Sequence, residues 1–309
     1  RFDEQNNIQW AERMEEAGCT ILYGAEDIKV HSKICLITRR ERGRLQHITQ
    51  VGTGNYNEKT ARQYTDLCLI TSNPAIGADA AAFFQNMSIS NLEGEYRHLL
   101  VAPNGLKNRL ISLIDGETAK ARAGKPAHIF IKCNSVTDRD LIDKLSEASQ
   151  AGVDIVLNVR GICCLRPGVP GKTDRIRVFS IVGRYLEHPR IFAFGVGKDA
   201  RLYIGSADLM TRNTERRVEI ACPVLDEGIR RQIAHYVDVL CRDNGKARLM
   251  GSDGHYFPVP DRGEAPLDAQ AAFMEEAARQ EPAPGAVSPA PERRKGFFAA
   301  VLDRLKSRS

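Results

Sequence analysis

The feature that most constrains the fold of this chain is a block of sequence that occurs twice. Residues 52–70 follow a strand-like segment at 48–51, and residues 205–223 follow a similar segment at 201–204. An internal repeat of this length predicts two halves with similar structures. Laid together without gaps, the blocks match Gly52 with Gly205, Thr53 with Ser206, Asn55 with Asp208, Lys59 with Arg212, and Asp66 with Glu219.

Each block is preceded by a strand-like segment that carries a histidine and, two residues later, a basic residue. These pairs are His31 with Lys33 and His188 with Arg190. Both halves also contain a predicted helix that runs into Ala-Gly and then into a strand, at 10–22 and at 141–157. Helices that alternate with short β-branched strands predict an α/β sandwich in each half.

The two halves differ at their beginnings. In the second half a predicted strand, His128–Cys133, precedes the helix, whereas the first half begins at the equivalent of the loop that follows such a strand. The chain also lacks an initial Met, so we expect it to be truncated, with its first leading strand missing. Residues 104–123 read as a helix that Gly124 ends. We therefore predict one domain at 1–98 that carries His31 and a second at 99–258 that carries His188.

The remaining segment, 259–309, has a different composition. It holds 6 of the 14 prolines and equal numbers of acidic and basic residues, so the net charge of +5 belongs to residues 1–258. A Pro/Ala-rich segment buries too little apolar surface to offset its ordering entropy, which predicts a disordered linker. Residues 293–306 combine a basic cluster with apolar residues at helical spacing. This pattern fits a terminal helix that docks or floats free, or a weak peripheral anchor on an anionic membrane.

Composition excludes several classes of protein. No apolar run approaches the roughly 18 residues that a membrane-spanning helix needs, and the polar start does not resemble a signal peptide. The eight cysteines form no Cys-x-x-Cys pair, and most lie in apolar runs. They predict reduced, buried thiols in a cytoplasmic protein, and argue against a disulfide framework or a zinc site.

The repeated residues suit phosphoryl chemistry. Imidazole is a good nucleophile that is largely neutral near pH 7, and a cation two residues away can stabilise phosphate oxygens. A Gly-rich turn lets backbone N–H groups and a hydroxyl approach the phosphate closely. Asp66 and Glu219 could each hold the far nitrogen of a histidine and fix its tautomer, or could instead pair with nearby arginines.

At this point the pattern resembles a known superfamily. Two His-x-Lys half-sites that meet in one active site are typical of the phospholipase D-like fold. Thr38 stands where that superfamily has an aspartate, seven residues after the histidine, which argues against plain phosphodiester hydrolysis. The chain more closely resembles the long, phosphohistidine-forming bacterial polyphosphate kinase family over residues 1–258. The motifs that carry this resemblance are RFDEQNN at 1–7, VHSK at 30–33, GTGNYNEKTAR at 52–62, YTD at 64–66, VRG at 159–161, SIVGRYLEH at 180–188 and SADLMTRN at 206–213.

The resemblance implies a role for individual residues. His31 matches the nucleophile that takes the γ-phosphate of ATP, and His188 matches an acid/base partner beside the nucleotide. Tyr64 and Arg160 match nucleotide contacts, and Arg1 matches a residue at the magnesium–phosphate site. A guanidinium has no free lone pair for a cation, so Arg1 should touch phosphate oxygens that also bind Mg²⁺. Further candidates for phosphate contacts are Lys33, Asn55, Lys59, Arg62, Arg190, Ser206, Arg212 and Arg217, and a basic channel could also include Arg166, Arg175 and Arg216.

Three functions remain open from sequence. The first is a reversible polyphosphate kinase that uses ATP, ADP, inorganic polyphosphate and Mg²⁺ through phospho-His31, and whose truncated form has little synthetic activity. The second is a phospholipase D-like hydrolase, in which water discharges the intermediate. The third is a non-catalytic binder of polyphosphate or nucleic acid, although aromatic residues are only 6% and show no stacking pattern for bases. The family resemblance also implies a homo-oligomer, and no nucleic-acid partner is expected.

Overall fold

A computed structural model describes residues 4–24, 28–261 and 263–279 of the chain. The described residues divide into two compact units, 4–23 with 275–279, and 24–274. The first unit contains helix α1, Glu4–Glu16, which begins earlier than the sequence predicts. The strand expected near residue 22 is not formed. Residues 19–23 belong to no helix or strand and pair with no other strand. Arg1, the predicted magnesium–phosphate residue, lies outside the described residues.

The first half of the larger unit is a small sheet covered by a helix. Strands β2, β3 and β5 form an antiparallel three-stranded sheet in the order β2-β3-β5. Ile76 and Phe83 of α3 pack with Val51 and Leu69 of the sheet. The elements are β1 Lys29–Val30, β2 Ile34–Glu41, β3 Arg44–Gly52, α2 Glu58–Ala61, β4 Tyr64–Thr65, β5 Cys68–Thr71 and α3 Pro74–Ser88.

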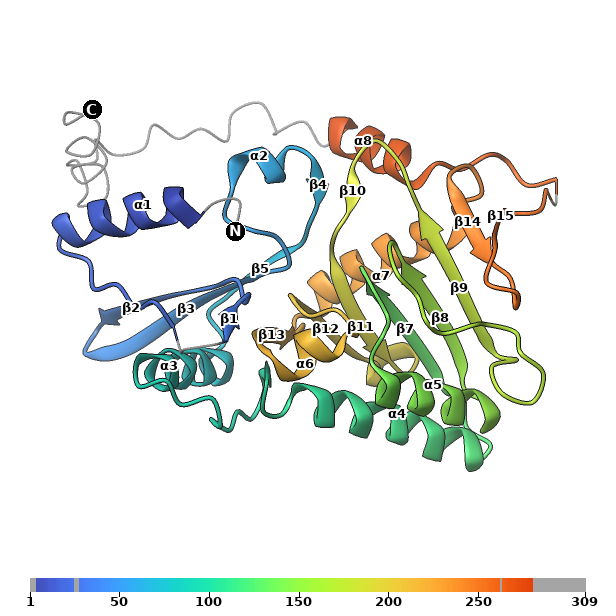
Figure 1. The fold of residues 1–309 in the computed structure, drawn as a ribbon, viewed down its shortest axis with the longest axis horizontal. Helices are drawn as coiled ribbons and strands as arrows, with labels where there is room; N and C mark the ends of the chain where they lie inside the picture. Colours follow the sequence, from blue (N-terminus) through green and yellow to red (C-terminus); the bar gives the residue numbers. More distant parts are fainter. Residues whose placement is uncertain (1–3, 25–27, 262, 280–309) are drawn as a thin grey trace. The chain divides into compact units, whose positions relative to one another are not determined.

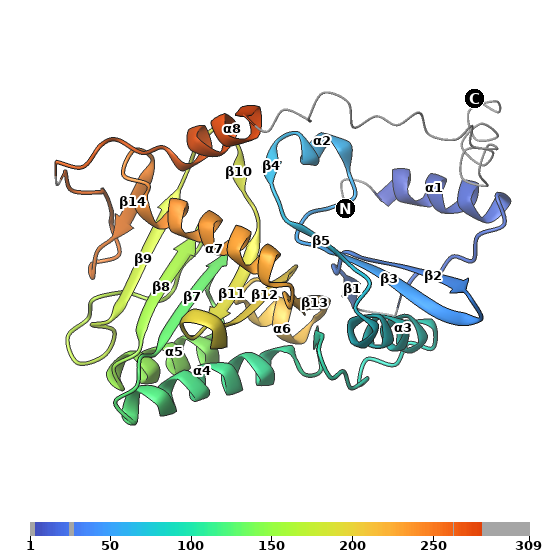
Figure 2. The same cartoon turned by 180° about the vertical axis from the view of Figure 1, so that it is seen from behind.

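The second half is a three-layer sandwich. Helices α4 and α5 lie on one face of a large sheet and α7 lies on the other (Figure 1, and from behind in Figure 2). In the described part of the chain this sheet has ten strands, in the order β1-β13-β12-β11-β7-β8-β9-β14-β15, with β6 also paired to β13. The elements are β6 Leu100–Ala102, α4 Leu106–Arg122, β7 His128–Cys133, α5 Arg139–Gln150, β8 Asp154–Val159, β9 Ile176–Ile181, β10 Leu186–Glu187, β11 Arg190–Phe194, β12 Arg201–Gly205, α6 Thr211–Glu215, β13 Arg217–Pro223, α7 Glu227–Arg242, β14 Ala247–Met250, β15 Tyr256–Pro258 and α8 Ala269–Arg279.

The sequence periodicity explains these layers. In α5 the residues Leu141, Leu145 and Ala148 recur at helical spacing and are fully buried. They pack with alternate residues of β7, such as Ile129 and Ile131, while the intervening Phe130 faces the core on the α7 side. The predicted strand at His128–Cys133 and the helix within 104–123 are thus confirmed, and Gly124 ends α4 with a φ of +69°.

The two halves share strands as well as a core. Strand β1 of the first half pairs in parallel with β13, and β4 of the first half pairs in parallel with β10. One hydrophobic cluster joins residues of both halves, such as Val51 and Leu69 with Ile204 and Ile220. Residues 24–274 therefore form a single structural body, although the sequence shows two repeats.

The tail and the thiols differ from the sequence predictions. Within the predicted linker at 259–309, residues 269–279 form helix α8, because Ala269 and Gln270 at its start are buried. Residues 280–309, which include the predicted basic terminal helix, lie outside the described residues. All eight cysteines are free, but the prediction of burial is wrong for Cys35, Cys68 and Cys164. Cys35 and Cys68 alternate with the residues of β2 and β5 that face α3, so they lie on the other face of the sheet. In the parts described, no helix is both long enough and apolar enough to cross a membrane.

Gly205, the first residue of the second repeat block, is required by close packing between β12 and β13. A Cβ atom there would overlap the carbonyl oxygen of Ile220 and lie 2.9 Å from the Cα of Ala221. We expect Gly205→Ala to lower the free energy of unfolding by about 3 kcal/mol, because a packed sheet cannot relieve this overlap. Urea unfolding measures the change.

Gly116→Ala is the matched control for that substitution. Gly116 lies in α4, and a Cβ there would meet no atom within 4 Å outside its own helix. Alanine is a better helix former, so this variant should gain about 0.5–1 kcal/mol. Equal effects of the two substitutions would contradict the close packing at Gly205.

Candidate active site

The two repeat blocks form two nearly identical turns. In the first, the backbone N–H of Thr53 donates to Leu67 O, and its hydroxyl donates to Asp66 Oδ1 at 2.6 Å. In the second, the N–H of Ser206 donates to Ile220 O, and its hydroxyl donates to Glu219 Oε2 at 2.5 Å. Each turn therefore fixes one carboxylate by the hydroxyl that follows the repeated glycine.

Gly54 makes room for the first of these carboxylates. A Cβ at Gly54 would overlap the side chain of Asp66, so only glycine lets the carboxylate lie against this turn. The second half has the fully buried Ala207 at the matching position, and the longer acidic side chain of Glu219 in place of Asp66. The two turns thus hold an aspartate and a glutamate by the same backbone pattern.

Strand pairing between the halves places a histidine opposite each carboxylate. In the β1–β13 ladder Val30 pairs with Val218, so the next residues along both strands are His31 and Glu219. In the β4–β10 ladder Thr65 pairs with Glu187, so the next residues are Asp66 and His188. Parallel register alone therefore brings each histidine to the carboxylate of the other half.

Both histidines contact those carboxylates through Nδ1. His31 Nδ1 lies 2.9 Å from Glu219 Oε2, and His188 Nδ1 lies 2.9 Å from Asp66 Oδ1. An ionised carboxylate only accepts hydrogen bonds, so each Nδ1 carries a proton and each Nε2 keeps its lone pair when the ring is neutral. The sequence left either histidines or arginines open as partners of Asp66 and Glu219, and in the structure both carboxylates contact histidines.

Glu219 is the more deeply enclosed of the two carboxylates. Its side chain is fully buried, whereas 23% of the Asp66 side chain is exposed. Besides His31 and Ser206, Glu219 accepts a hydrogen bond from Asn213 Nδ2 at 2.6 Å. Three donors satisfy this buried charge and hold it in one orientation against His31.

The two cations that follow the histidines lie inside the site. Lys33 and Arg190 are almost fully buried. The Nζ of Lys33 donates to the carbonyl oxygen of His31 at 2.5 Å. Arg190 forms a fork with Asp208 at 3.2 and 3.3 Å, which leaves its Nη1 at 3.0 Å from His188 Nε2. Positive charge is thus concentrated beside both rings, where a phosphate would need it.

A polar chain links this centre to Arg160. The Nε of Arg160 donates to Asn134 Oδ1 at 3.1 Å, and the backbone N–H of Asn134 donates to Asp208 Oδ1 at 2.7 Å. Asp208 therefore connects Arg160 with Arg190. Tyr64, the other predicted nucleotide contact, places its ring 4.9 Å from the ring of His188, centroid to centroid.

Burial lowers the pKa of both histidines. For His31 the loss of solvent outweighs the opposing effect of Glu219, and Lys33 and Arg190 lower its pKa further. For His188 the loss of solvent again dominates, with Arg190 and Lys33 acting in the same direction against Asp66. The same two cations act on both histidines, so the two half-sites form one electrostatic centre. Burial also lowers the pKa of Lys33 to about 8.

The other predicted phosphate contacts are distributed around this centre. The side chains of Asn55, Lys59, Arg62 and Arg212 are exposed, on or beside the short helices α2 and α6 that follow the two turns. Arg217 begins β13 and acts electrostatically on Lys33. Arg216 is exposed just before it, and Arg166 lies beside Gly254 in the β14–β15 hairpin.

Arg175 is not brought to the centre. It pairs with Asp154 at 2.6 Å, at the start of β8, whereas Arg160 follows the other end of that strand. A strand of this length spans about 17 Å, so Arg175 lies well away from Arg160, and its place in a basic channel stays a prediction.

The residues that the sequence did not indicate are those that hold the site from behind. Asn134 lies in no motif that the sequence offers. Asp208 and Asn213 lie in the SADLMTRN motif at 206–213, but the sequence assigns them no role in holding the site, and only the match of Asp208 with Asn55 directs attention to one of them. In the structure Asp208 is buried against Arg190, whereas Asn55 is exposed. The two half-sites are therefore alike in their histidines and carboxylates but not in this supporting residue.

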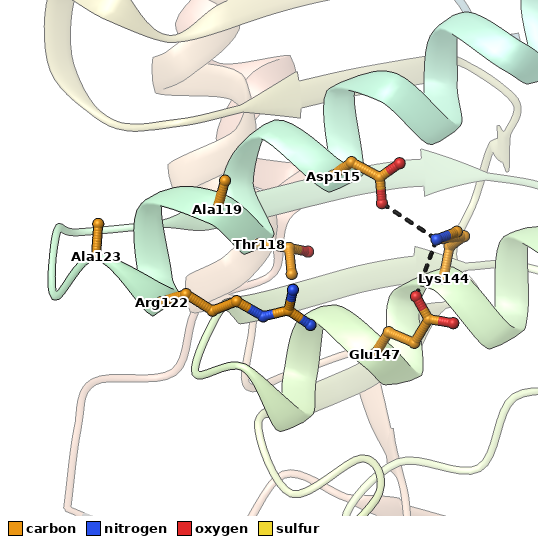
Figure 3. Close-up of a pocket in the computed structure, with 7 residues that line it drawn as sticks. All are labelled: Asp115, Thr118, Ala119, Arg122, Ala123, Lys144 and Glu147. Carbon is orange, nitrogen blue, oxygen red and sulfur yellow. Dashed lines mark hydrogen bonds and ion pairs between the residues drawn. The ribbon is translucent and has the colours of Figure 1, made fainter.

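A separate pocket lies between α4 and α5. It has a volume of about 520 Å³ and is lined by residues such as Thr118, Arg122 and Lys144. Lys144 bridges Asp115 at 3.3 Å and Glu147 at 2.9 Å (Figure 3). None of the predicted site residues lines this pocket, so the chemistry is assigned to the histidine centre.

Comparisons with known proteins agree with the sequence motifs. Residues 99–270 match the family described as polyphosphate kinase C-terminal domain 2, and residues 1–93 match polyphosphate kinase C-terminal domain 1. The chain is 45% identical over 270 residues to a polyphosphate kinase of Bacillus cereus, covering 87% of this chain and 38% of that protein. It is 46% identical over 275 residues to a polyphosphate kinase of Thermosynechococcus vestitus, covering 89% and 38%.

A solved structure matches as well. The crystal structure of polyphosphate kinase from Porphyromonas gingivalis superposes with a TM-score of 0.82 at 38% identity, over 88% of this chain and 42% of that one. The chain thus spans about two fifths of the length of these relatives. Two matched half-sites in one centre are also the arrangement that the phospholipase D-like resemblance implied.

Proposed function

Because the chain belongs to the polyphosphate kinase family, we propose that it carries the phosphotransfer centre of an ATP:polyphosphate phosphotransferase, with His31 as the phosphorylated residue. The observation that carries this proposal is the contact of His31 Nδ1 with the buried carboxylate of Glu219, 2.9 Å away. It leaves Nε2 as the free nucleophile in a site that holds Lys33 and Arg190. Conversion of ATP and inorganic polyphosphate is the family's reaction and is proposed here for this chain.

The first step forms a bond between His31 Nε2 and the γ-phosphorus of ATP and breaks the bond from that phosphorus to the β–γ bridging oxygen. ADP leaves with this oxygen. The lowered pKa of His31 keeps the ring neutral and nucleophilic near pH 7. The imidazolium character that develops is stabilised by Glu219, while Lys33 and Arg190 stabilise the charge on the equatorial phosphate oxygens.

The second step transfers the phosphoryl group to an acceptor. A terminal oxygen of a polyphosphate chain attacks the phosphorus, the N–P bond breaks, and His31 recovers its lone pair. The same steps in reverse return the group to ADP. His188, whose Nε2 lies beside Arg190, is proposed to hold or donate a proton at the nucleotide side, and Tyr64 and Arg160 are proposed to contact the nucleotide.

Mg²⁺ is proposed as a companion of the nucleotide. Magnesium sites in such enzymes use one or two carboxylates together with substrate phosphates. The carboxylates of this centre are already engaged, Asp66 and Glu219 by histidines and hydroxyls and Asp208 by Arg190 and the N–H of Asn134, and the nearby cations do not bind metals. The described residues of the centre therefore do not fit a magnesium site of their own, and Mg²⁺ would enter with the phosphates of ATP.

The experiment that tests this function follows the fate of the phosphoryl group. Full-length protein is incubated with γ-³²P-ATP and Mg²⁺, and the protein-bound label is tested for the acid lability and base stability of phosphohistidine. The label should return to ADP as ATP and pass to polyphosphate, and it should persist in water alone. Label that water discharges, or cleavage of phosphodiesters without label, would favour the hydrolase.

The activity is expected to have a bell-shaped pH dependence, because protonation of one site group and deprotonation of another each lower it. At low pH His31 is protonated and loses the lone pair with which it attacks phosphorus. Burial lowers the pKa of His31 below the ordinary 6.5, so activity should persist further into the acid range than it would with an exposed imidazole. At high pH Lys33 loses its charge, with a pKa of about 8. A profile of kcat/KM at constant free Mg²⁺ tests both limbs. A rate that stays level up to about pH 10 would contradict a role for the charge of Lys33.

We propose three further properties. The family resemblance implies assembly as a homo-oligomer, the free thiols favour a cytoplasmic location, and the low aromatic content without a stacking pattern argues against a nucleic-acid partner. Sedimentation of the full-length protein with and without ATP would test the first.

A further inference from the structure

A buried ion pair lies directly behind His188. The Nζ of Lys132 in β7 lies 3.0 Å from Glu187 Oε2 in β10, and the two side chains are 1% and 2% exposed. Removing two such charges from water is expensive, and apolar residues of similar size often stabilise a fold equally well. Stability alone therefore does not explain why this pair is buried here.

Glu187 gathers donors from several elements. Its Oε2 accepts hydrogen bonds from Tyr236 of α7 at 3.2 Å and from Thr65 of β4 at 3.3 Å, and its Oε1 accepts one from Gln270 of α8 at 2.7 Å. Lys132 also donates to Asn158 Oδ1 in β8 at 3.0 Å. One carboxylate thus ties β10 to four other elements of the fold.

The strands that this carboxylate holds have little support of their own. The β4–β10 ladder consists of two residue pairs, Tyr64 with Leu186 and Thr65 with Glu187 (β4 and β10 lie side by side in Figures 1 and 2). A pair of strands this short is not stable alone. Yet the residues that follow it are Asp66 and His188, whose 2.9 Å contact belongs to the active centre.

The start of α8 holds the chain just before β10. Gln270, which is 4% exposed, accepts a hydrogen bond from Tyr185 N and donates one to Tyr185 O, both at 2.9 Å. Gly183 lets it approach, because a Cβ there would lie 2.5 Å from Gln270 Oε1. The side-chain amide of Gln270 therefore bonds the backbone of Tyr185 as a neighbouring strand would, and it also contacts Glu187.

We propose that the Lys132–Glu187 pair, together with Gln270, is a positioning device for His188: it fixes the β4–β10 strands so that His188 meets Asp66. None of the three residues touches a reacting group, and all act through the strand that ends at His188. The effect of the device on rate rests on the proposed function, whereas its effect on the His188–Asp66 hydrogen bond does not.

The test replaces the pair by apolar residues of similar size, Lys132→Met with Glu187→Leu, in the full-length protein. We expect the variant to fold, because no unpaired charge is left. Its unfolding midpoint should lie at or below that of the parent, because Tyr236, Thr65 and Gln270 lose their buried acceptor. In protein with ¹⁵N-labelled histidine, the low-field Nδ1–H resonance of His188, identified by its loss in His188→Gln, should disappear. The kcat for phosphotransfer should fall about 10- to 100-fold, as for other supporting residues behind a site.

The matched control is a Lys–Glu pair that lies away from these strands. Lys144 and Glu147 on α5 are 2.9 Å apart and half-exposed (Figure 3). Lys144→Met with Glu147→Leu should leave both the His188 resonance and kcat unchanged.

A folded Lys132→Met/Glu187→Leu protein that keeps the His188 resonance overturns the proposal. If that variant does not fold, Gln270→Met decides: it removes the contacts of Gln270 with Glu187 and Tyr185, and it should weaken the same resonance and lower kcat in the same direction. An unchanged resonance in folded Gln270→Met overturns the proposal. Loss of the resonance without any effect on phosphotransfer supports the positioning device and contradicts the proposed role of His188.

Discussion

Replacing His31 by alanine is expected to abolish phosphohistidine formation and to lower the rate of phosphotransfer on the order of 10⁴-fold or more. The reason is chemical: the proposed nucleophile of the covalent step is removed, and the remaining cations can only bind the substrate. Rapid-quench labelling with γ-³²P-ATP measures the first effect, and steady-state turnover measures the second. The KM for ATP should change little, because the proposed nucleotide and phosphate contacts Tyr64, Arg160 and Arg190 remain.

His255→Ala is the matched control. His255 is 79% exposed and pairs with Asp253 at 3.3 Å, in the hairpin between β14 and β15. This variant should label and turn over like the parent. Labelling that survives in His31→Ala but is lost in His188→Ala would assign the nucleophile to the other histidine and overturn the order of steps proposed above.

Glu219→Gln is expected to lower the rate of phosphohistidine formation about 10³- to 10⁴-fold with little change in folding at neutral pH. In other sites, an amide in place of the carboxylate that orients a histidine selects the wrong tautomer and has an effect of this size. Here the amide would also have to satisfy Ser206, Asn213 and His31, which all donate to Glu219. The amide carries donors of its own, so it cannot accept from all three in the same geometry.

Single-turnover labelling compares this variant with Glu215→Gln, in which a half-exposed carboxylate on α6 that binds Lys107 is changed in the same way. The control should keep the parental rate. If Glu219→Gln labelled as fast as the parent, the 2.9 Å contact would not determine the tautomer of His31, and the proposed function would lose its main support.

Much of this centre can be predicted from the sequence, because the two repeat blocks can be aligned with each other. A single His-x-Lys is weak, but the matched pairs Thr53 with Ser206 and Asp66 with Glu219 predict two similar turns, and the structure contains both. Helical and strand periodicity likewise predicts α4, α5 and β7 with small errors at their ends. These are local patterns, and local patterns are what a sequence expresses directly.

The pairing between the halves is the part that the sequence does not show. The residues of each histidine–carboxylate pair are more than a hundred positions apart, and the pairing depends on the two-residue ladders β1–β13 and β4–β10. The sequence predicts one strand through each histidine, and this is wrong: His31 lies between β1 and β2, and His188 lies between β10 and β11. Nothing in the composition of Tyr64–Thr65 distinguishes that segment from a loop. The partners of these short strands come from tertiary packing, as do the buried contacts of Lys132, Asp208 and Gln270.

The exchange of carboxylates also bears on how such a chain could arise by duplication. An ancestral half would have contained a histidine and a carboxylate that do not pair with each other, and alone it would have had no complete centre. Two copies related by a two-fold axis would have completed both pairs at once, because the carboxylate of each copy would have contacted the histidine of the other. Fusion of two such genes would then have joined the partners of an existing symmetric dimer, and freed the two histidines to diverge into different tasks.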